Sequence, residues 1–236
     1  PSIGGVLASA AWYFPFFLPL FAIPIGLIAL FYLDRKKDLN DQKLSDYLKH
    51  AWMSVKDKRV MAVFIASIVT FIILYGSYLS YFPFLFYYKF NSEAYVIGIF
   101  MSVMSLSTAL TSSRLGKLSE KYSEKKLLKA AFIFYIISLL LFPFIEIIWM
   151  LVIPLVLFGI AQGLNIPSLQ TLLANLAPAE NRAAFMSING TVLRLGQTLG
   201  PLLMGLIFGW LGMSAVFISA AILAAGMLLV VGVMVE

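Results

Sequence analysis

Residues 60–82 read VMAVFIASIVTFIILYGSYLSYF, an apolar run without a charged side chain. An α-helix needs about 20 predominantly apolar residues to cross the roughly 30 Å hydrocarbon core of a bilayer. Similar runs recur along the chain, at residues 14–33, 94–115, 127–145, 148–172, 184–208 and 214–235. Together with residues 60–82, these six runs predict seven membrane-spanning helices.

The composition excludes a soluble domain. Of the 236 residues, 61% are hydrophobic and 12% are charged, whereas soluble domains carry about 25% charged residues. Because lipid offers the backbone no hydrogen-bond partners, apolar runs of this length predict an all-α membrane protein. The chain has no cysteine, which excludes disulfides, thiolate chemistry and Cys-ligated metals. We expect neither a cofactor nor a metal.

Basic residues mark the loops that face the cytoplasm. Of the 17 Lys and Arg residues, eight lie in residues 35–59, six in residues 114–129, and one is Arg182. The alternate connections hold a single basic residue, Lys89. This bias predicts a cytoplasmic C-terminus in a multi-pass cell-membrane protein, and it accounts for the net charge of +6 without a nucleic-acid partner.

A polar stretch, residues 34–59, separates the span at 14–33 from the next six. Its apolar side chains recur at helical spacing, at Leu44, Leu48, Ala51, Trp52 and Val55. This pattern predicts an amphipathic helix lying on the membrane surface. An unstructured, solvated linker is the alternative.

The two ends of the chain are related by an internal repeat with an offset of 200 residues. It pairs Pro1 with Pro201, Gly5 with Gly205 and Phe17 with Phe217. Because some transporters are built from parallel repeats of membrane halves, we predict three parts. Residues 1–33 end the fifth span and form the sixth span of an N-terminal half, residues 34–59 link the halves, and residues 60–236 form a six-span C-terminal half. By this symmetry about 140 residues precede Pro1, in a parent of about 380 residues and twelve spans.

Three segments resemble the major facilitator superfamily. Residues 116–126, GKLSEKYSEKK, are similar to its loop pattern G-x-L-[AS]-D-[RK]-x-G-[RK]-[RK], with Glu120 in place of Asp and Ser123 in place of Gly. Residues 1–5, PSIGG, resemble the tail of the antiporter motif G-P-x-x-G-G. Residues 189–205, NGTVLRLGQTLGPLLMG, are similar to the eleventh span of drug-efflux members.

The resemblance covers the whole chain, and it implies an N-terminally truncated piece of a drug:proton antiporter. A small amphipathic substrate, protons, the bilayer and the missing N-terminal half are the partners it implies. Export would proceed by alternating access between two six-span halves. In such antiporters the proton-carrying acid usually lies in the N-terminal half, outside this chain.

The loop at residues 116–126 is a candidate gate at the cytoplasmic mouth. Gly116 would let a helix end turn sharply, while the charges of Glu120, Lys121, Lys125 and Lys126 would exchange partners and hold one conformation. A plain positive-inside loop is the alternative.

Proline and glycine residues in the first and last parts of the chain form a helix-bend motif. Its members are Pro1, Gly4, Gly5, Gly200, Pro201 and Gly205. A proline removes one helix hydrogen bond and bends the span. Glycines four residues apart let helices approach closely, and such pairs occur at 159/163, 196/200 and 205/209.

Arg194 is the strongest single candidate for contact with a substrate. It lies twelve positions after Arg182, which is about 18 Å along a helix. An Arg at that depth costs at least about 2.5 kcal/mol unless it faces water or a partner. It shares a helix face with Gln197, and structural pairing at the cytoplasmic rim is the alternative role.

Further candidates lie on two other predicted spans. Gln162 and Asn165 are three residues apart and therefore on one helix face, and Tyr75 and Tyr78 are aromatic. With Arg194 and Gln197 they would line an amphipathic central cavity suited to a bulky, partly apolar solute.

Other classes of membrane protein fit the sequence less well. An uptake carrier for a sugar or an organic acid is the nearest alternative to an exporter. Only the antiporter-like motif at residues 1–5 argues against it. A seven-span receptor or retinal protein is a remote alternative, since the last span has no Lys for a Schiff base. A membrane enzyme would need clustered catalytic groups within the bilayer, and the single histidine, His50, lies in the polar loop.

Overall fold

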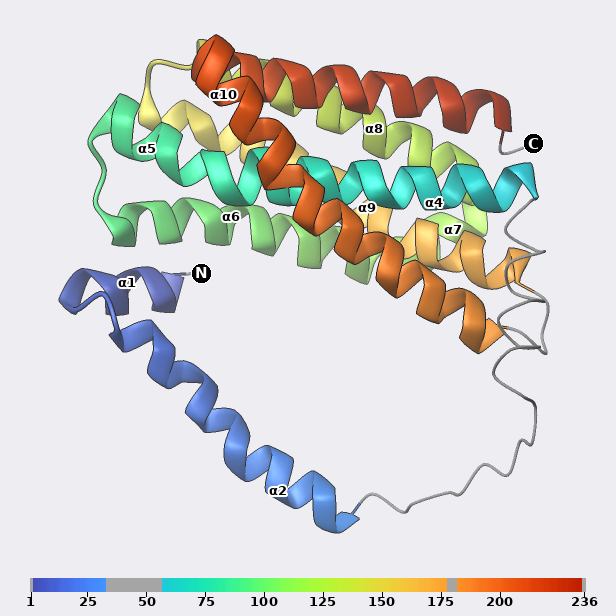
Figure 1. The fold of residues 1–236 in the computed structure, drawn as a ribbon, viewed down its shortest axis with the longest axis horizontal. Helices are drawn as coiled ribbons and strands as arrows, with labels where there is room; N and C mark the ends of the chain where they lie inside the picture. Colours follow the sequence, from blue (N-terminus) through green and yellow to red (C-terminus); the bar gives the residue numbers. More distant parts are fainter. Residues whose placement is uncertain (1, 33–56, 178–181, 235–236) are drawn as a thin grey trace.

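The structure, a computed structural model, describes residues 2–32, 57–177 and 182–234, and every element in these ranges is helical (Figure 1). The α-helices are α1 (Ser2–Ala10), α2 (Ala22–Tyr32), α4 (Lys58–Phe71), α5 (Phe82–Phe90), α6 (Ala94–Ser113), α7 (Leu115–Lys121), α8 (Glu124–Leu141), α9 (Val152–Leu176) and α10 (Arg182–Met234). Three 3-10 helices, η1 (Phe14–Phe21), η3 (Phe142–Phe144) and η4 (Ile148–Leu151), and one π-helix, η2 (Ile72–Tyr81), join them. The all-α prediction is confirmed.

Two predicted features lie outside the described residues. They are Pro1 and the apolar positions of the predicted surface helix, Leu44 to Val55.

Within the described ranges, five continuous helical stretches are long and apolar enough to cross a membrane. They are Lys58–Phe90, Ala94–Ser113, Glu124–Phe144, Ile148–Leu176 and Phe185–Val233. The last stretch is two helices, because α10 turns sharply at Gly212, where φ is 81° and ψ is −175° (Figure 1). This backbone conformation is almost restricted to glycine. With the two parts of α10 taken separately, the helical stretches of the described chain coincide with the six apolar runs of residues 60–236, and their crossing of a membrane stays a prediction.

The first of these spans is longer than predicted. Asp57 caps its start by accepting a hydrogen bond from the Arg59 backbone N–H at 2.8 Å. The helix then continues through Pro83, at the point where the backbone passes from the π-helix η2 into α5. Asn91, in the left-handed conformation with φ of 46°, ends the helix. The prediction that this span covers residues 60–82 therefore ends the helix too early, because the helix runs on to Phe90.

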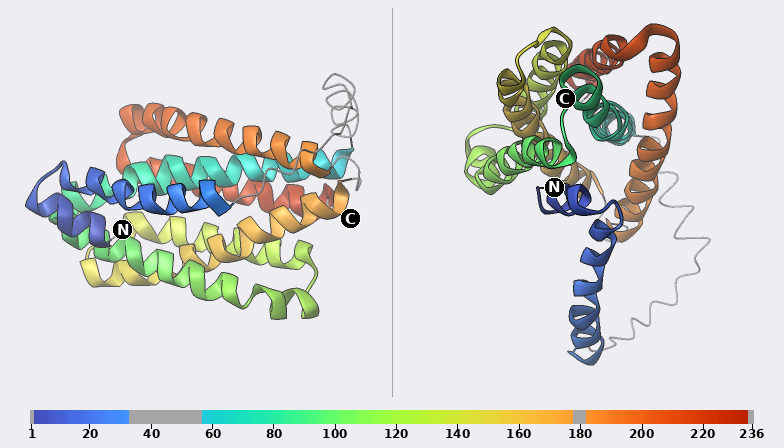
Figure 2. Two further views of the ribbon diagram at one scale, coloured as in Figure 1. Left: turned by 90° about the horizontal axis from the view of Figure 1, so that it is seen from below. Right: turned by 90° about the vertical axis from the view of Figure 1, so that its left-hand side faces the viewer.

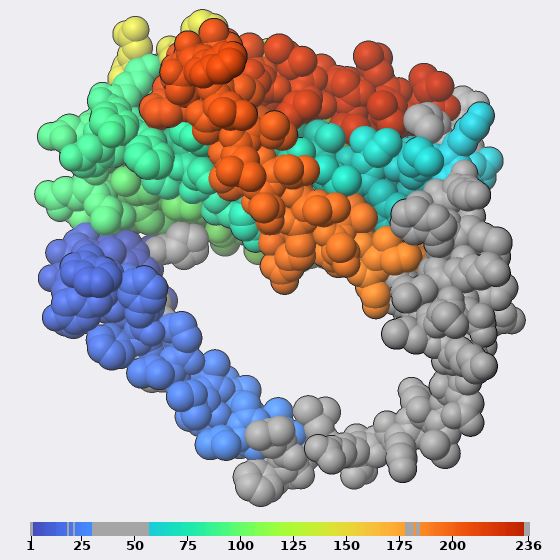
Figure 3. Space-filling view, viewed as in Figure 1, coloured from blue at the N-terminus to red at the C-terminus, as the bar shows by residue number. Residues whose placement is uncertain are grey.

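The predicted span at residues 14–33 is helical but not uniform. Its first part, η1, is a 3-10 helix with Pro15 near its start and Pro19 inside it. Prolines lack the N–H that a regular α-helix needs, which accounts for the tighter winding here. η1 and α2 lead away from the other helices (Figures 1 and 3). Their apolar side chains, such as Ile25 at 70% exposure, are open.

The long helices run side by side (Figure 2), and among them α9 packs against α4, α6 and α8. Lipid tails are as apolar as these side chains, so the helices associate through close packing rather than through a hydrophobic driving force. A Cβ added at Gly159 would lie 2.6 Å from Met104 O, and one at Gly163 would lie 2.8 Å from Thr108 O. α6 and α9 thus touch backbone to backbone at both glycines.

α10 approaches α4 and η2 equally closely. A Cβ at Gly196 would lie 2.7 Å from Ile68 O, and one at Gly200 would lie 2.9 Å from Gly76 N. The third predicted pair behaves differently. At Gly205 the nearest atom to an added Cβ is Tyr81 OH at 3.4 Å, and at Gly209 nothing lies within 4 Å. The pair at 205/209 is therefore not a close helix contact.

α1 docks on the outer surface of α6. The Ser2 hydroxyl lies 2.6 Å from the Ser102 hydroxyl, and a Cβ at Gly5 would lie 2.8 Å from Ala94 O. Gly4 has nothing within 4 Å of such a Cβ. Of the two glycines in the opening motif, Gly5 makes the helix contact.

Candidate functional site

A polar face runs along the first part of α10. Arg194 and Thr198 are exposed, and Gln197 is half-buried. Arg194 Nη1 donates to Gln197 Oε1 at 2.8 Å, and the Thr198 hydroxyl donates to Arg194 O at 3.1 Å. The side chains on this face are therefore held in one cluster by bonds within their own helix.

The polar face points away from the helices that α10 packs on. Gly196, which touches α4, follows Arg194 by two residues, a rotation of about 200° around the helix. Gly190 lies on the polar side and has nothing within 4 Å of an added Cβ. Pro201 is half-buried inside α10. Arg194 thus projects from a membrane-length helix, and its side-chain hydrogen bond within the described chain goes to Gln197 of the same helix.

The amide side chains of α9 are buried inside the bundle. Gln162 Oε1 accepts a hydrogen bond from the Tyr135 hydroxyl on α8. Asn165 Oδ1 accepts one from the Thr70 hydroxyl on α4 at 2.9 Å. Polar side chains within membranes often join helices in this way. In this conformation, Gln162 and Asn165 therefore join helices instead of standing free on a cavity wall, and their contact with substrate stays a prediction.

The two candidate tyrosines lie in η2, where the backbone is wound as a π-helix. Tyr78 is 2% exposed and stacks between Phe82 and Phe158, with ring centroids 5.2 and 4.9 Å away. Tyr75 is half-buried and stacks on Phe71 at 5.7 Å. Short π-helical segments occur often at functional sites. Of the two tyrosines, Tyr75 is the more open.

Several buried polar atoms in the described bundle lack a hydrogen-bond partner. They are Tyr78 OH, Asn165 Nδ2, Ser168 Oγ and Asn189 Oδ1. Asn189 borders a small cavity of about 10 Å³ with Ser67 and Gln170, and a space of that size holds about one water molecule. Sequence patterns missed Thr70, Tyr135 and Asn189, because periodicity shows which residues share a face but not what covers it.

The candidate gate is largely helical. Gly116 lies inside α7, and the chain leaves α6 at Arg114, which has φ of −95° and ψ of −4°. The expectation that Gly116 makes a sharp turn is therefore wrong, because an ordinary residue makes it. Glu120, Lys121 and Lys126 are exposed, whereas Lys125 is half-buried. Their gating role stays a prediction.

Within the described ranges, no group of three His, Asp or Glu side chains gathers in one place. Membrane-length helices, packed through glycines and small polar side chains, define a multi-pass membrane protein.

Comparison with known proteins identifies the family. The model of the Major Facilitator Superfamily matches residues 1–148 and 89–235, two overlapping stretches. The chain belongs to this superfamily of membrane transporters.

Relatives in two bacteria are named multidrug resistance protein MdtG. The protein of Escherichia fergusonii is 33% identical over 128 residues, which are 54% of this chain and 31% of the relative. That of Salmonella schwarzengrund is 28% identical over 229 residues, which are 94% of this chain and 56% of the relative. The chain thus spans about half the length of the relative that it matches along nearly all of its residues.

Proposed function

We propose that this chain is the latter part of a transporter that exports small amphipathic molecules, in exchange for protons, by alternating access. Residues 60–236 would form the second six-span half, residues 34–59 the link, and residues 1–33 the end of the first half. The C-terminus would be cytoplasmic in a cell membrane, as the distribution of basic residues indicates. The protein would act without a cofactor and would not be an enzyme.

The exposed polar face of α10 is the observation that supports transport most directly. An Arg in the bilayer is costly unless it faces water or a partner. Within the described chain, Arg194 bonds to a residue of its own helix, Gln197. We infer that this face borders a water-filled path between the two halves, where Arg194 contacts the substrate. Tyr75 and the amides of Gln162 and Asn165 would be further contacts once the helices rearrange.

Three groups of residues would serve the conformational change. The helix-bend motif, with Gly200, Pro201 and Gly205 in α10, would accommodate the rocking of one half. The charges of Glu120 and Lys121 beside α8 would help to hold the cytoplasmic mouth in one state. Gly5 on α6 would form part of the sliding contact between the halves, since its close approach leaves no side chain in the way.

The export of a dye from cells tests this function. Cells that express the full-length protein and are loaded with a fluorescent amphipathic dye are expected to lose it faster than cells with an empty vector. A protonophore is expected to remove the difference, because the exchange consumes the proton gradient. Dye fluorescence over time measures both effects.

The alternative, an uptake carrier, predicts the opposite direction. Faster dye accumulation in the expressing cells would contradict export. Equal rates with every dye in a panel of anionic, neutral and cationic compounds would contradict the amphipathic substrate class.

A further inference from the structure

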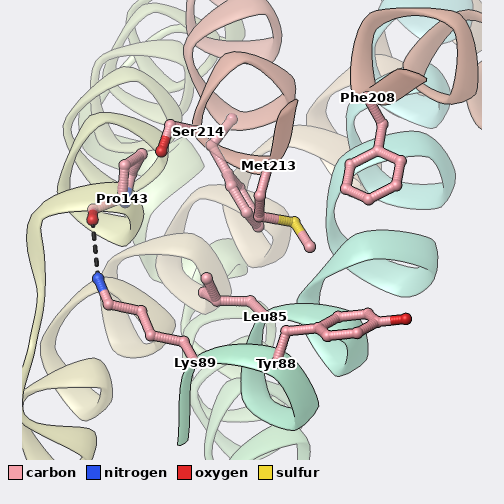
Figure 4. Close-up of a pocket in the computed structure, with 8 residues that line it drawn as sticks. Leu85, Tyr88, Lys89, Pro143, Phe208, Met213 and Ser214 are labelled. Atoms are coloured by element: carbon pink, nitrogen blue, oxygen red, sulfur yellow. Dashed lines mark hydrogen bonds between the residues drawn. The ribbon is translucent and has the colours of Figure 1, made fainter. Parts of the chain in front are cut away.

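A pocket of about 470 Å³ opens at the end of the bundle where α10 turns. It lies between α5, η3 and the two parts of α10, as Figure 4 shows. Lys89 stands on one side of the pocket and Phe208 on the other, with Leu85 and Met213 between them (Figure 4). The volume falls within the roughly 300 to 1,000 Å³ typical of ligand pockets.

The pocket has one charged group and an otherwise mostly apolar lining. Lys89 Nζ donates to Pro143 O at 3.0 Å and lies 6.0 Å from the centre of the Phe90 ring. An ammonium group carries three N–H donors, so two remain for a ligand. The described lining contains no carboxylate. A ligand with a negative head and an apolar tail would match this distribution.

Exposed aromatic side chains place the pocket at the depth of the lipid headgroups. Tyr88 is 69% exposed, and the same end of the bundle carries Tyr87 at 60%, Trp149 at 73% and Trp210 at 88%. Tyr and Trp gather at membrane–water interfaces because their rings are amphipathic. Lys89 therefore lies at the depth of a lipid phosphate group, beside the mostly apolar lining of the pocket.

We propose that this pocket binds an anionic phospholipid of the outer leaflet. The Lys89 ammonium would bind the phosphate while it keeps its bond to Pro143 O, and one acyl chain would lie against Phe208 and Met213. A zwitterionic lipid would bind less well, because its own cation offsets the phosphate charge. The choice of leaflet rests on the orientation proposed above, in which Lys89 is the one basic residue of the outer connections.

A photoreactive lipid tests the site directly. The full-length protein is mixed with phosphatidylglycerol that carries a diazirine in its acyl chain, irradiated and digested, and the crosslinked peptides are identified by mass spectrometry. We expect crosslinks on the segment 208–217. The same probe built on phosphatidylcholine is expected to give severalfold less, because its choline cation offsets the charge of the phosphate that Lys89 would bind.

A substitution locates the charge that selects the lipid. Lys89→Gln keeps a donor for Pro143 O but removes the charge, so it is expected to lower the phosphatidylglycerol yield to that of phosphatidylcholine. Lys117→Gln, at an exposed position in α7, is the matched control and is expected to change nothing at 208–217.

The comparison of the two lipids uses the unmodified protein, so this test does not depend on whether a variant folds. Equal crosslinking by both lipids, no crosslink on 208–217, or an unchanged yield in Lys89→Gln would overturn the proposal. Because crosslinking requires no transport, a protein that crosslinks selectively but exports no dye would contradict the proposed function and leave the lipid site standing.

Discussion

Replacing Arg194 with Ala is expected to lower dye export about 10- to 100-fold while leaving the amount of protein in the membrane unchanged. The loss corresponds to one charge-assisted hydrogen bond to the substrate, about 1.5 to 3 kcal/mol. Folding should be unaffected, because the described contacts of the Arg194 side chain are with Gln197 on the same helix. Export rate, divided by the amount of protein on an immunoblot of the membranes, measures the effect.

Two further variants separate substrate contact from a general effect of charge. Arg182→Ala removes the same side chain from the exposed start of α10 and is expected to retain export. Arg194→Lys keeps the charge but loses the planar fork of donors, so it is expected to fall between the wild type and Arg194→Ala. Full export by Arg194→Ala would refute the assignment of this residue.

Replacing Gly200 with Leu is expected to separate α10 from η2 and to lower the stability of the folded protein. A Cβ at this position would already lie 2.9 Å from Gly76 N and 3.1 Å from Ile72 Cα. Backbone atoms cannot move aside as a flexible side chain can. Overpacking costs about 1 to 3 kcal/mol even where side chains can adjust, so this variant should lose at least that much. The melting temperature of the protein in detergent measures the change.

Gly226→Leu is the matched control, because nothing lies within 4 Å of a Cβ added at Gly226 in the second part of α10. It is expected to melt at nearly the wild-type temperature. If Gly200→Leu melted at that temperature too, the close contact between α10 and η2 would be contradicted.

The sequence predicted the spans well, because the membrane imposes a simple rule on apolar length. The six spans of residues 60–236 and the turn near Gly212 followed from apolar runs interrupted by short connections. The extension of the first span to Phe90 did not follow from the sequence, because a proline directly after an apolar run, as at Pro83, is typical of a helix end.

Which residues face a cavity was harder to predict. The spacing of Gln162 and Asn165 correctly places them on one helix, but Tyr135 and Thr70 cover them from helices distant in sequence. Arg194 differs, because the glycines that pack on α4 and η2 occupy the other side of α10. A charged side chain in a predicted span, which costs free energy in lipid, is therefore a better guide to an open position than polar residues that share a helix face.

The labelling of a single cysteine at position 198 tests the central claim, that the polar face of α10 lines a water-filled path. The chain contains no cysteine, so Thr198→Cys adds a unique thiol beside Arg194 in this part of the protein. A membrane-impermeant maleimide is expected to label it, at a rate that changes severalfold when substrate is added. Ile222→Cys, at a position 65% exposed in the second part of α10, is the lipid-facing control and is expected to stay unlabelled. The account would be contradicted if the Thr198→Cys thiol were as unreactive as that control when the maleimide is added from either side of the membrane.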